Sequence, residues 1–60
     1  MDYSSRSLIK RLIEAGWILK RCNGSHHQYI KGGRVVTVPH PRKDLKYGTY
    51  NAILKQSGLK

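Results

Sequence analysis

Two adjacent histidines, His26 and His27, are the residues of this sequence best suited to chemistry. Histidine is the side chain whose ordinary pKa lies closest to neutrality, so it can take a proton from one oxygen and return it to another. An RNA strand offers such a proton at each 2′-hydroxyl, and a base there turns the hydroxyl into a nucleophile on the adjacent phosphate. Nearby lysines or arginines would stabilise the charge that develops on that phosphate. This chemistry needs no cofactor and no metal, although a histidine pair without other context is more often a polar surface feature.

Metal and disulfide chemistry are not expected from the remaining residues of these types. Cys22 is the single cysteine, which excludes a disulfide within the chain and fits a reducing compartment. Together with the histidines it shows none of the paired spacings typical of a zinc site. We therefore expect Cys22 to be a small, half-buried hydrophobic residue.

Length and charge restrict the class of protein. Sixty residues make one domain, 1–60, because chains this short lie near the lower limit for independent folding. Twelve Lys and Arg against three Asp and Glu give a formal net charge of +9, which predicts an anionic partner. The 38% hydrophobic share is too high for a typical disordered polycation. No apolar run approaches a transmembrane span, so we expect a soluble, cytoplasmic protein without membrane contact.

Helical spacing of apolar residues predicts a first helix from Ser5 to Ala15. Ser4 can accept a hydrogen bond from the free amides of the first turn, and Tyr3 can pack on Leu8. Gly16 supplies the left-handed residue that ends the helix. A second, shorter stripe predicts a helix around Tyr50, Ile53 and Leu54 that ends near Ser57.

Between the helices, two turn dipeptides separate three β-prone runs. Asn23-Gly24 and Gly32-Gly33 favour the positive φ angles of tight hairpins. The predicted strands are Trp17 to Cys22, Ser25 to Lys31 and Arg34 to Val38. Prolines then end the sheet, and a polar connection runs from His40 to Lys46. The fold class is therefore α+β, with the order αβββα.

We expect both helices to lie on one face of a three-stranded antiparallel sheet. This arrangement buries the apolar residues of that face and leaves the other face to water. Double-stranded-RNA-binding domains have this architecture. With two-residue turns, Arg21 would face His26, Leu19 would face Gln28, and Ile18 would face Tyr29. On the other side of the central strand, Gln28 would face Thr37 and Tyr29 would face Val36.

This register puts alternate positions of each strand on opposite faces of the sheet. We expect the helices to cover the face with Ile18, Lys20, Cys22, Ser25, His27, Tyr29, Val36 and Val38. The open face would then carry Trp17, Leu19, Arg21, His26, Gln28, Ile30, Val35 and Thr37. A single bulge would exchange neighbours between the faces, His26 with His27 included.

Three segments of the sequence resemble the HicA family of toxins. They are Gly24-Ser25-His26-His27-Gln28-Tyr29, Val36-Thr37-Val38-Pro39-His40-Pro41 and Ile53-Leu54-Lys55-Gln56-Ser57-Gly58-Leu59, and Gly16-Trp17 after the first helix fits as well. The resemblance covers nearly the whole chain. It implies a double-stranded-RNA-binding-domain fold, a small ribonuclease that cleaves mRNA, and inhibition by a HicB-like antitoxin encoded beside it.

The resemblance also implies which residues act. The Gly24 to His27 element matches the family motif that contains the catalytic histidine, whose position varies between members. We expect His26 to be the base, with His27 second, and Gly24 to serve the turn that presents it. The implied products are a 2′,3′-cyclic phosphate and a 5′-hydroxyl. We expect no contact with DNA by this chain alone.

Residues expected to contact RNA are basic side chains and polar groups of the proposed open face. The basic residues would bind phosphate without reading sequence, and solvated surface charge is the alternative for each of them. His40 is expected to be structural or simply exposed, while Trp17 and Tyr29 are expected in the core rather than stacked on bases. The full set is Lys20, Arg21, Gly24, Ser25, Gln28, Lys31, Arg34, Thr37, Arg42 and Lys43.

Two other classes of function stay open at this stage. A non-catalytic RNA-binding module fits the fold and the charge equally well, but it would leave transcripts intact. A structural protein whose charge serves assembly, for instance on the ribosome, would bind RNA without either histidine, and its expression would be harmless.

Overall fold

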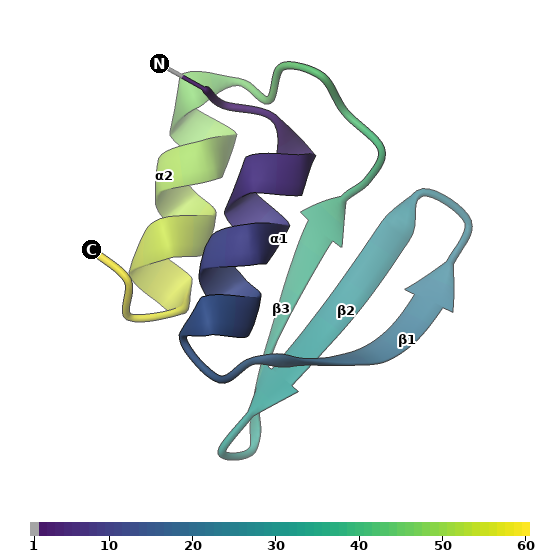
Figure 1. Ribbon diagram of the computed structural model, residues 1–60, viewed down its shortest axis with the longest axis vertical. Helices are drawn as coiled ribbons and strands as arrows, with labels where there is room; N and C mark the ends of the chain where they lie inside the picture. Colours follow the sequence, from purple (N-terminus) through teal and green to yellow (C-terminus); the bar gives the residue numbers. More distant parts are fainter. Residues whose placement is uncertain (1) are drawn as a thin grey trace.

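Five elements follow one another along the chain in the order helix, three strands, helix. The computed structural model describes residues 2–60 (Figure 1). Their bounds are α1 Ser5–Glu14, β1 Ile18–Asn23, β2 His26–Lys31, β3 Arg34–Pro39 and α2 Tyr47–Gln56. The predicted αβββα order and α+β class are confirmed, and each predicted boundary of the first four elements lies within one residue of the observed one.

The first helix begins and ends where its local signals predicted. The Ser4 hydroxyl accepts a hydrogen bond from the Ser7 amide at 3.2 Å, which satisfies one of the free amides of the first turn. Gly16 follows the helix with a φ of +98°, a backbone conformation that side chains with a Cβ rarely adopt. The ring of Tyr3 packs edge-on against Tyr47 and Tyr50 of α2. The segment that precedes α1 thus packs against α2.

The strands form one antiparallel sheet in the order β1-β2-β3. The pairs Gln28–Thr37 and Tyr29–Val36 are as predicted. The first turn is not, because it consists of Gly24-Ser25 rather than Asn23-Gly24. Gly24 is the one residue of this turn with a positive φ, +60°. A turn with a positive φ at its first central residue only is of type II′, which favours glycine there and leaves Asn23 in the strand.

Moving the turn by one residue changes every pair between β1 and β2. His26 lies opposite Asn23, His27 opposite Cys22, and Gln28 opposite Arg21. The predicted pair Arg21–His26 is therefore wrong, as are Leu19–Gln28 and Ile18–Tyr29.

A bulge interrupts β1 between Leu19 and Arg21, where Lys20 is the extra residue. Beyond it, Ile18 lies opposite Ile30, and Leu19 lies opposite Tyr29. Since cross-strand partners share a face, Leu19 joins the helix-covered face and Ile18 the open one, the reverse of the prediction. The histidines lie at the other end of the sheet, so this bulge does not exchange them.

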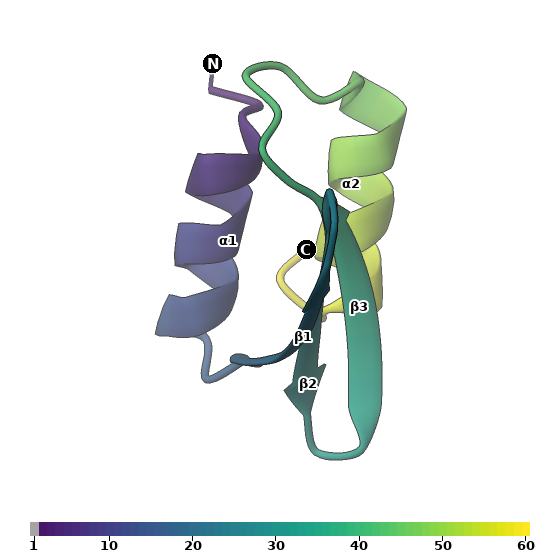
Figure 2. The ribbon, with the colours of Figure 1, turned by 90° about the vertical axis from the view of Figure 1, so that its right-hand side faces the viewer.

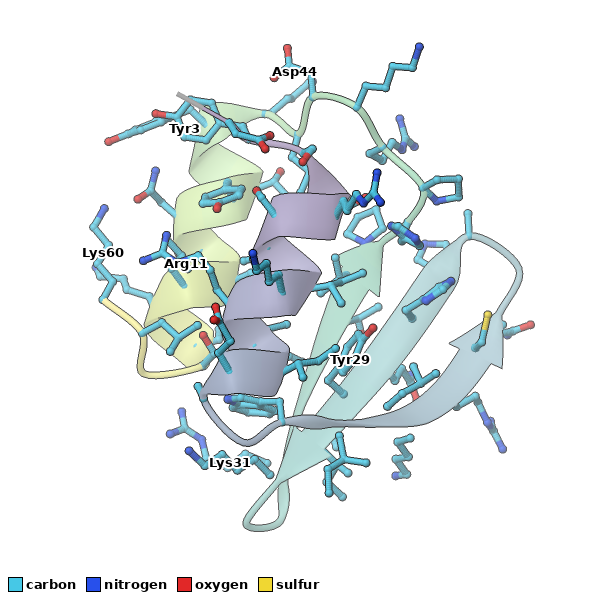
Figure 3. All side chains as sticks on the ribbon, viewed as in Figure 1. Tyr3, Arg11, Tyr29, Lys31, Asp44 and Lys60 are labelled. Carbon is cyan, nitrogen blue, oxygen red and sulfur yellow. The ribbon has the colours of Figure 1, made fainter. Side chains whose placement is uncertain are left out.

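The core lies between the sheet and the two helices, which stand side by side on one face of the sheet (Figures 1 and 2). Tyr29, Val36 and Val38 of the sheet are buried, as predicted for their face, and Tyr29 lies between β2 and α1 (Figure 3). Trp17 is also buried, so its predicted place on the open face is wrong and its predicted core role is confirmed. The buried hydrophobic residues are Leu8, Leu12, Trp17, Tyr29, Val36, Val38, Leu45, Tyr50, Ile53 and Leu54.

Two further observations concern the single cysteine and the length of the helices. Cys22 is exposed rather than half-buried, because it lies on an edge strand beyond the reach of the helices. Among residues 2–60, no helix is long and apolar enough to cross a lipid bilayer.

Candidate active site

The two neighbouring histidines point to opposite faces of the sheet, because side chains alternate along a strand. His26 is exposed on the open face, where its cross-strand neighbours are Asn23 and Pro39. His27 is half-buried on the helix-covered face, between Cys22 on β1 and Val38 on β3. The two rings therefore meet different surroundings.

His27 contacts two other polar side chains. Its Nε2 atom lies 3.2 Å from the Sγ atom of Cys22. On its other side the ring of His40 packs edge-on, with 4.7 Å between the ring centroids and 73° between the planes. Burial, and next the nearby Cys22, raises the pKa of the Tyr29 hydroxyl, so this phenol on the same face stays protonated near neutral pH.

His40 is held in place by the N-terminal end of α1. Its Nδ1 atom lies 2.7 Å from the hydroxyl of Ser5, a residue that is only 1% exposed. The His40 amide donates a hydrogen bond to the carbonyl of Ser25 in the β1–β2 turn, at 2.8 Å. Four side chains thus form a continuous line from the sheet edge to α1, and we call Cys22, His27, His40 and Ser5 the histidine row.

A basic groove adjoins the histidine row at the N-terminal end of α1. Three cations line it, Arg6 of α1 together with Arg42 and Lys43 of the connection after β3. The connection arches over this end of the helix layer in Figure 1, and His40 lines the groove as well. Asp2 is its one acidic residue, and the hydrogen bonds that its carboxylate accepts from Ser4 lower the pKa of Asp2 below its usual value.

The structure brings only some of the predicted RNA-contact residues to this place. Arg42 and Lys43 line the groove, and the Ser25 carbonyl holds His40. Gly24 forms the turn that connects to the strand of His27. Two of these four residues thus line the groove, and the other two form the turn before β2.

Other predicted residues lie on the opposite face of the sheet. Arg21, Gln28 and Thr37 form one row across the three strands, next to His26 on the open face. Their predicted grouping there is confirmed, although Arg21 faces Gln28 instead of His26. Lys20 is exposed at the bulge.

Lys31 and Arg34 lie at the far end of the sheet, beside the β2–β3 turn. The Lys31 ammonium donates a hydrogen bond to the carbonyl of Ala15 at the end of α1 (Figure 3). The Arg34 guanidinium donates one to Gln56 at the end of α2, at 2.7 Å. Cations at these positions satisfy terminal carbonyls and interact favourably with the helix dipole, so both residues stabilise the helices.

Sequence reasoning missed three members of the site. His40 was expected to be structural or exposed, and its hydrogen bonds to Ser5 and Ser25 bear out the structural part. Its contact with His27 was not expected, and Ser5 and Arg6 were not considered as site residues. Local patterns describe neighbours along the chain, whereas Ser5 and His40 meet across 35 positions. The signal that could have found them is the antiparallel order itself, since β3 must end where β2 begins and so places residue 40 beside residues 25–27.

Two imidazoles beside guanidinium and ammonium groups can move protons at a phosphate ester and hold its charge. Among residues 2–60, no three or more His, Cys, Asp or Glu side chains gather in an arrangement that could hold a metal ion. The imidazoles and cations of the site are suited to acid–base catalysis with electrostatic stabilisation.

The comparison with known families agrees with this architecture. The family model described as the HicA toxin of bacterial toxin–antitoxin systems matches residues 5–59, a span that contains all five elements. No curated protein matches the chain.

Proposed function

Because this chain belongs to the HicA toxin family of bacterial toxin–antitoxin systems, we propose that it is a metal-independent endoribonuclease that cleaves mRNA. Cleavage of transcripts in the cytoplasm would inhibit translation and growth. The observation that carries this proposal is the contact of His27 with His40 beside a groove lined by three cations. A histidine can activate the 2′-hydroxyl there while the cations hold the phosphate.

We assign the role of base to His27. Its ring is held between Cys22 and His40 on the side of the molecule where the basic groove lies. His26, which the sequence favoured, has the uncharged neighbours Asn23 and Pro39 and faces the other way. A base needs its substrate phosphate within hydrogen-bond reach, and the groove cations would supply that phosphate site, since His40 lines the groove and contacts His27.

The reaction we propose is a transesterification within the RNA strand. His27 takes the proton of the 2′-hydroxyl, whose oxygen then attacks the adjacent phosphorus. Arg6, Arg42 and Lys43 stabilise the additional negative charge on the phosphate oxygens. The bond to the 5′-oxygen breaks, which leaves a 2′,3′-cyclic phosphate and a 5′-hydroxyl. Arg21, Gln28 and Thr37 take no part at the cleaved bond because they face away from His27.

The partner of this surface is a HicB-like antitoxin. An inhibitor that competes with RNA must present groups complementary to the same cations, so we expect acidic side chains to cover the groove. With a formal net charge of +9 on the toxin, association should be fast and should slow as salt is raised.

Expression in a bacterium without the antitoxin tests the proposed function. Production of the wild-type protein should arrest growth, and sequencing of transcript 5′ ends should show new ends within coding regions. The same gene with an early stop codon is the control. Arrested growth with intact transcripts would favour an RNA-binding module instead, and harmless expression would favour an assembly protein.

A further inference from the structure

His40 is held more firmly than a residue in an exposed connection requires. Its backbone amide donates a hydrogen bond to the carbonyl of Ser25, and its Nδ1 atom is hydrogen-bonded to the hydroxyl of Ser5. Its ring packs edge-on against the ring of His27. The side chain is half-buried and lines the basic groove. The position and the orientation of the imidazole are therefore both determined by its surroundings.

The Ser5 hydroxyl can satisfy His40 in either protonation state. Its oxygen accepts a hydrogen bond from the Arg42 amide at 2.9 Å. Its proton has two possible acceptors, Nδ1 of His40 at 2.7 Å and the Arg42 carbonyl at 3.2 Å. When Nδ1 carries no proton, the hydroxyl donates to it.

When Nδ1 carries a proton, it donates to the Ser5 oxygen and the hydroxyl turns to the carbonyl of Arg42. A hydroxyl with one proton and two lone pairs is satisfied in both arrangements. The second arrangement serves both the imidazolium and the neutral ring that has lost its Nε2 proton, so His40 can give up that proton without losing its hydrogen bond to Ser5. The exchange would take place at Nε2, since Nδ1 is occupied by Ser5.

The distance between the two rings suits a single phosphodiester. The centroids of His27 and His40 are 4.7 Å apart, and both side chains are half-buried rather than sealed in the core. Groups this close can contact two oxygens of the same linkage, each at a hydrogen-bond distance of about 2.6–3.2 Å. The oxygen that departs needs a proton as much as the oxygen that attacks needs to lose one.

We infer that His40 is a second catalytic residue, the general acid that protonates the departing 5′-oxygen. This inference rests on the proposed function. His27 takes the proton from the 2′-oxygen, the bond from that oxygen to phosphorus forms, and the bond from phosphorus to the 5′-oxygen breaks. His40 delivers its Nε2 proton to the 5′-oxygen. Exchange with water then returns a proton to His40 and removes one from His27.

A change of leaving group tests the role of His40. One RNA carries the natural 5′-oxygen at its mapped cleavage site, and a second carries sulfur there. A thiol is far more acidic than an alcohol, so the sulfur departs without a proton. In the variant His40→Asn, the amide can still accept a hydrogen bond from Ser5 but supplies no acidic proton. The matched variant is His27→Asn.

We expect His40→Asn to cleave the oxygen substrate about 10²–10⁴-fold more slowly, and the sulfur substrate less than about tenfold more slowly. His27→Asn should be slow on both. The ratio of the two rates within one variant does not depend on how much of it is folded. Equal slowing of both substrates by His40→Asn, or slowing of neither, would overturn the inference while leaving the nuclease intact. A wild-type protein that cleaves neither RNA would overturn the proposed function and this inference together.

Discussion

Replacing His27 with alanine should slow RNA cleavage by about 10²–10⁴-fold, the usual contribution of a general base. His27 is the histidine that contacts His40 and lies on the same side as the basic groove. Without its imidazole, only water is left to accept the proton of the 2′-hydroxyl. The measurement is the initial rate of cleavage of a labelled RNA by purified protein.

His26→Ala is the matched control, since it removes the same side chain from the next position of the same strand. His26 is exposed and has no ring contact or hydrogen bond to the histidine row, so its removal should change the rate by less than about threefold. Thermal melting of both variants is the control that tells whether each is folded. A large loss in His26→Ala with a normal rate in His27→Ala would reverse the assignment of the base.

Leu12→Ala should leave little of the folded protein. Leu12 is completely buried between the helices and the sheet, and its carbonyl also accepts a hydrogen bond from the Trp17 amide. Truncation of a buried leucine costs about 3–5 kcal/mol. A domain of this size is stable by roughly 3–9 kcal/mol. We therefore expect the melting temperature to fall by about 25–40 °C.

Ile13→Ala serves as the comparison because it lies next to Leu12 in the same helix and is 56% exposed. It removes apolar surface that is already in contact with water, and alanine has the higher helix propensity. Its stability should stay within about 0.5 kcal/mol of the wild type. Equal melting temperatures for the two variants would contradict the assignment of the core.

Most of the fold could be predicted because its signals are local. Ser4 and Gly16 mark the two ends of α1, and Gly32-Gly33 marks the second hairpin with positive φ angles at both residues. The buried face with Tyr29, Val36 and Val38 followed from the alternation of apolar residues. Each of these features depends on neighbours within a few positions.

The register of β1 could not be predicted, because two turn types compete at one glycine. An Asn-Gly turn and a Gly-Ser turn both use the positive φ of Gly24, and they differ by one residue in where the strand ends. The bulge at Lys20 has no marker such as glycine in the sequence. Together these two features decided the neighbours of Arg21 and Leu19.

The site depended on contacts that no local pattern describes. The His26-His27 pair and its chemistry were visible in the sequence, but the partner of His27 was not. His40 reaches it because β3 runs antiparallel to β2 and because Ser5 holds the connection at the start of α1. Contacts between distant parts of the chain also decide the role of Lys31 and Arg34. Both were expected to contact phosphate, but their side chains donate hydrogen bonds to carbonyls at the ends of the helices.

The central claim is that an imidazole of this protein activates a ribose hydroxyl without the help of a metal ion. The most direct measurement uses an RNA whose mapped cleavage site carries a single 2′-deoxynucleotide, incubated with the protein in EDTA beside the unmodified strand. The account predicts that the unmodified strand is cut to a 2′,3′-cyclic phosphate end and that the modified linkage stays intact. Cleavage of the deoxy linkage, or loss of all cleavage in EDTA, would contradict it.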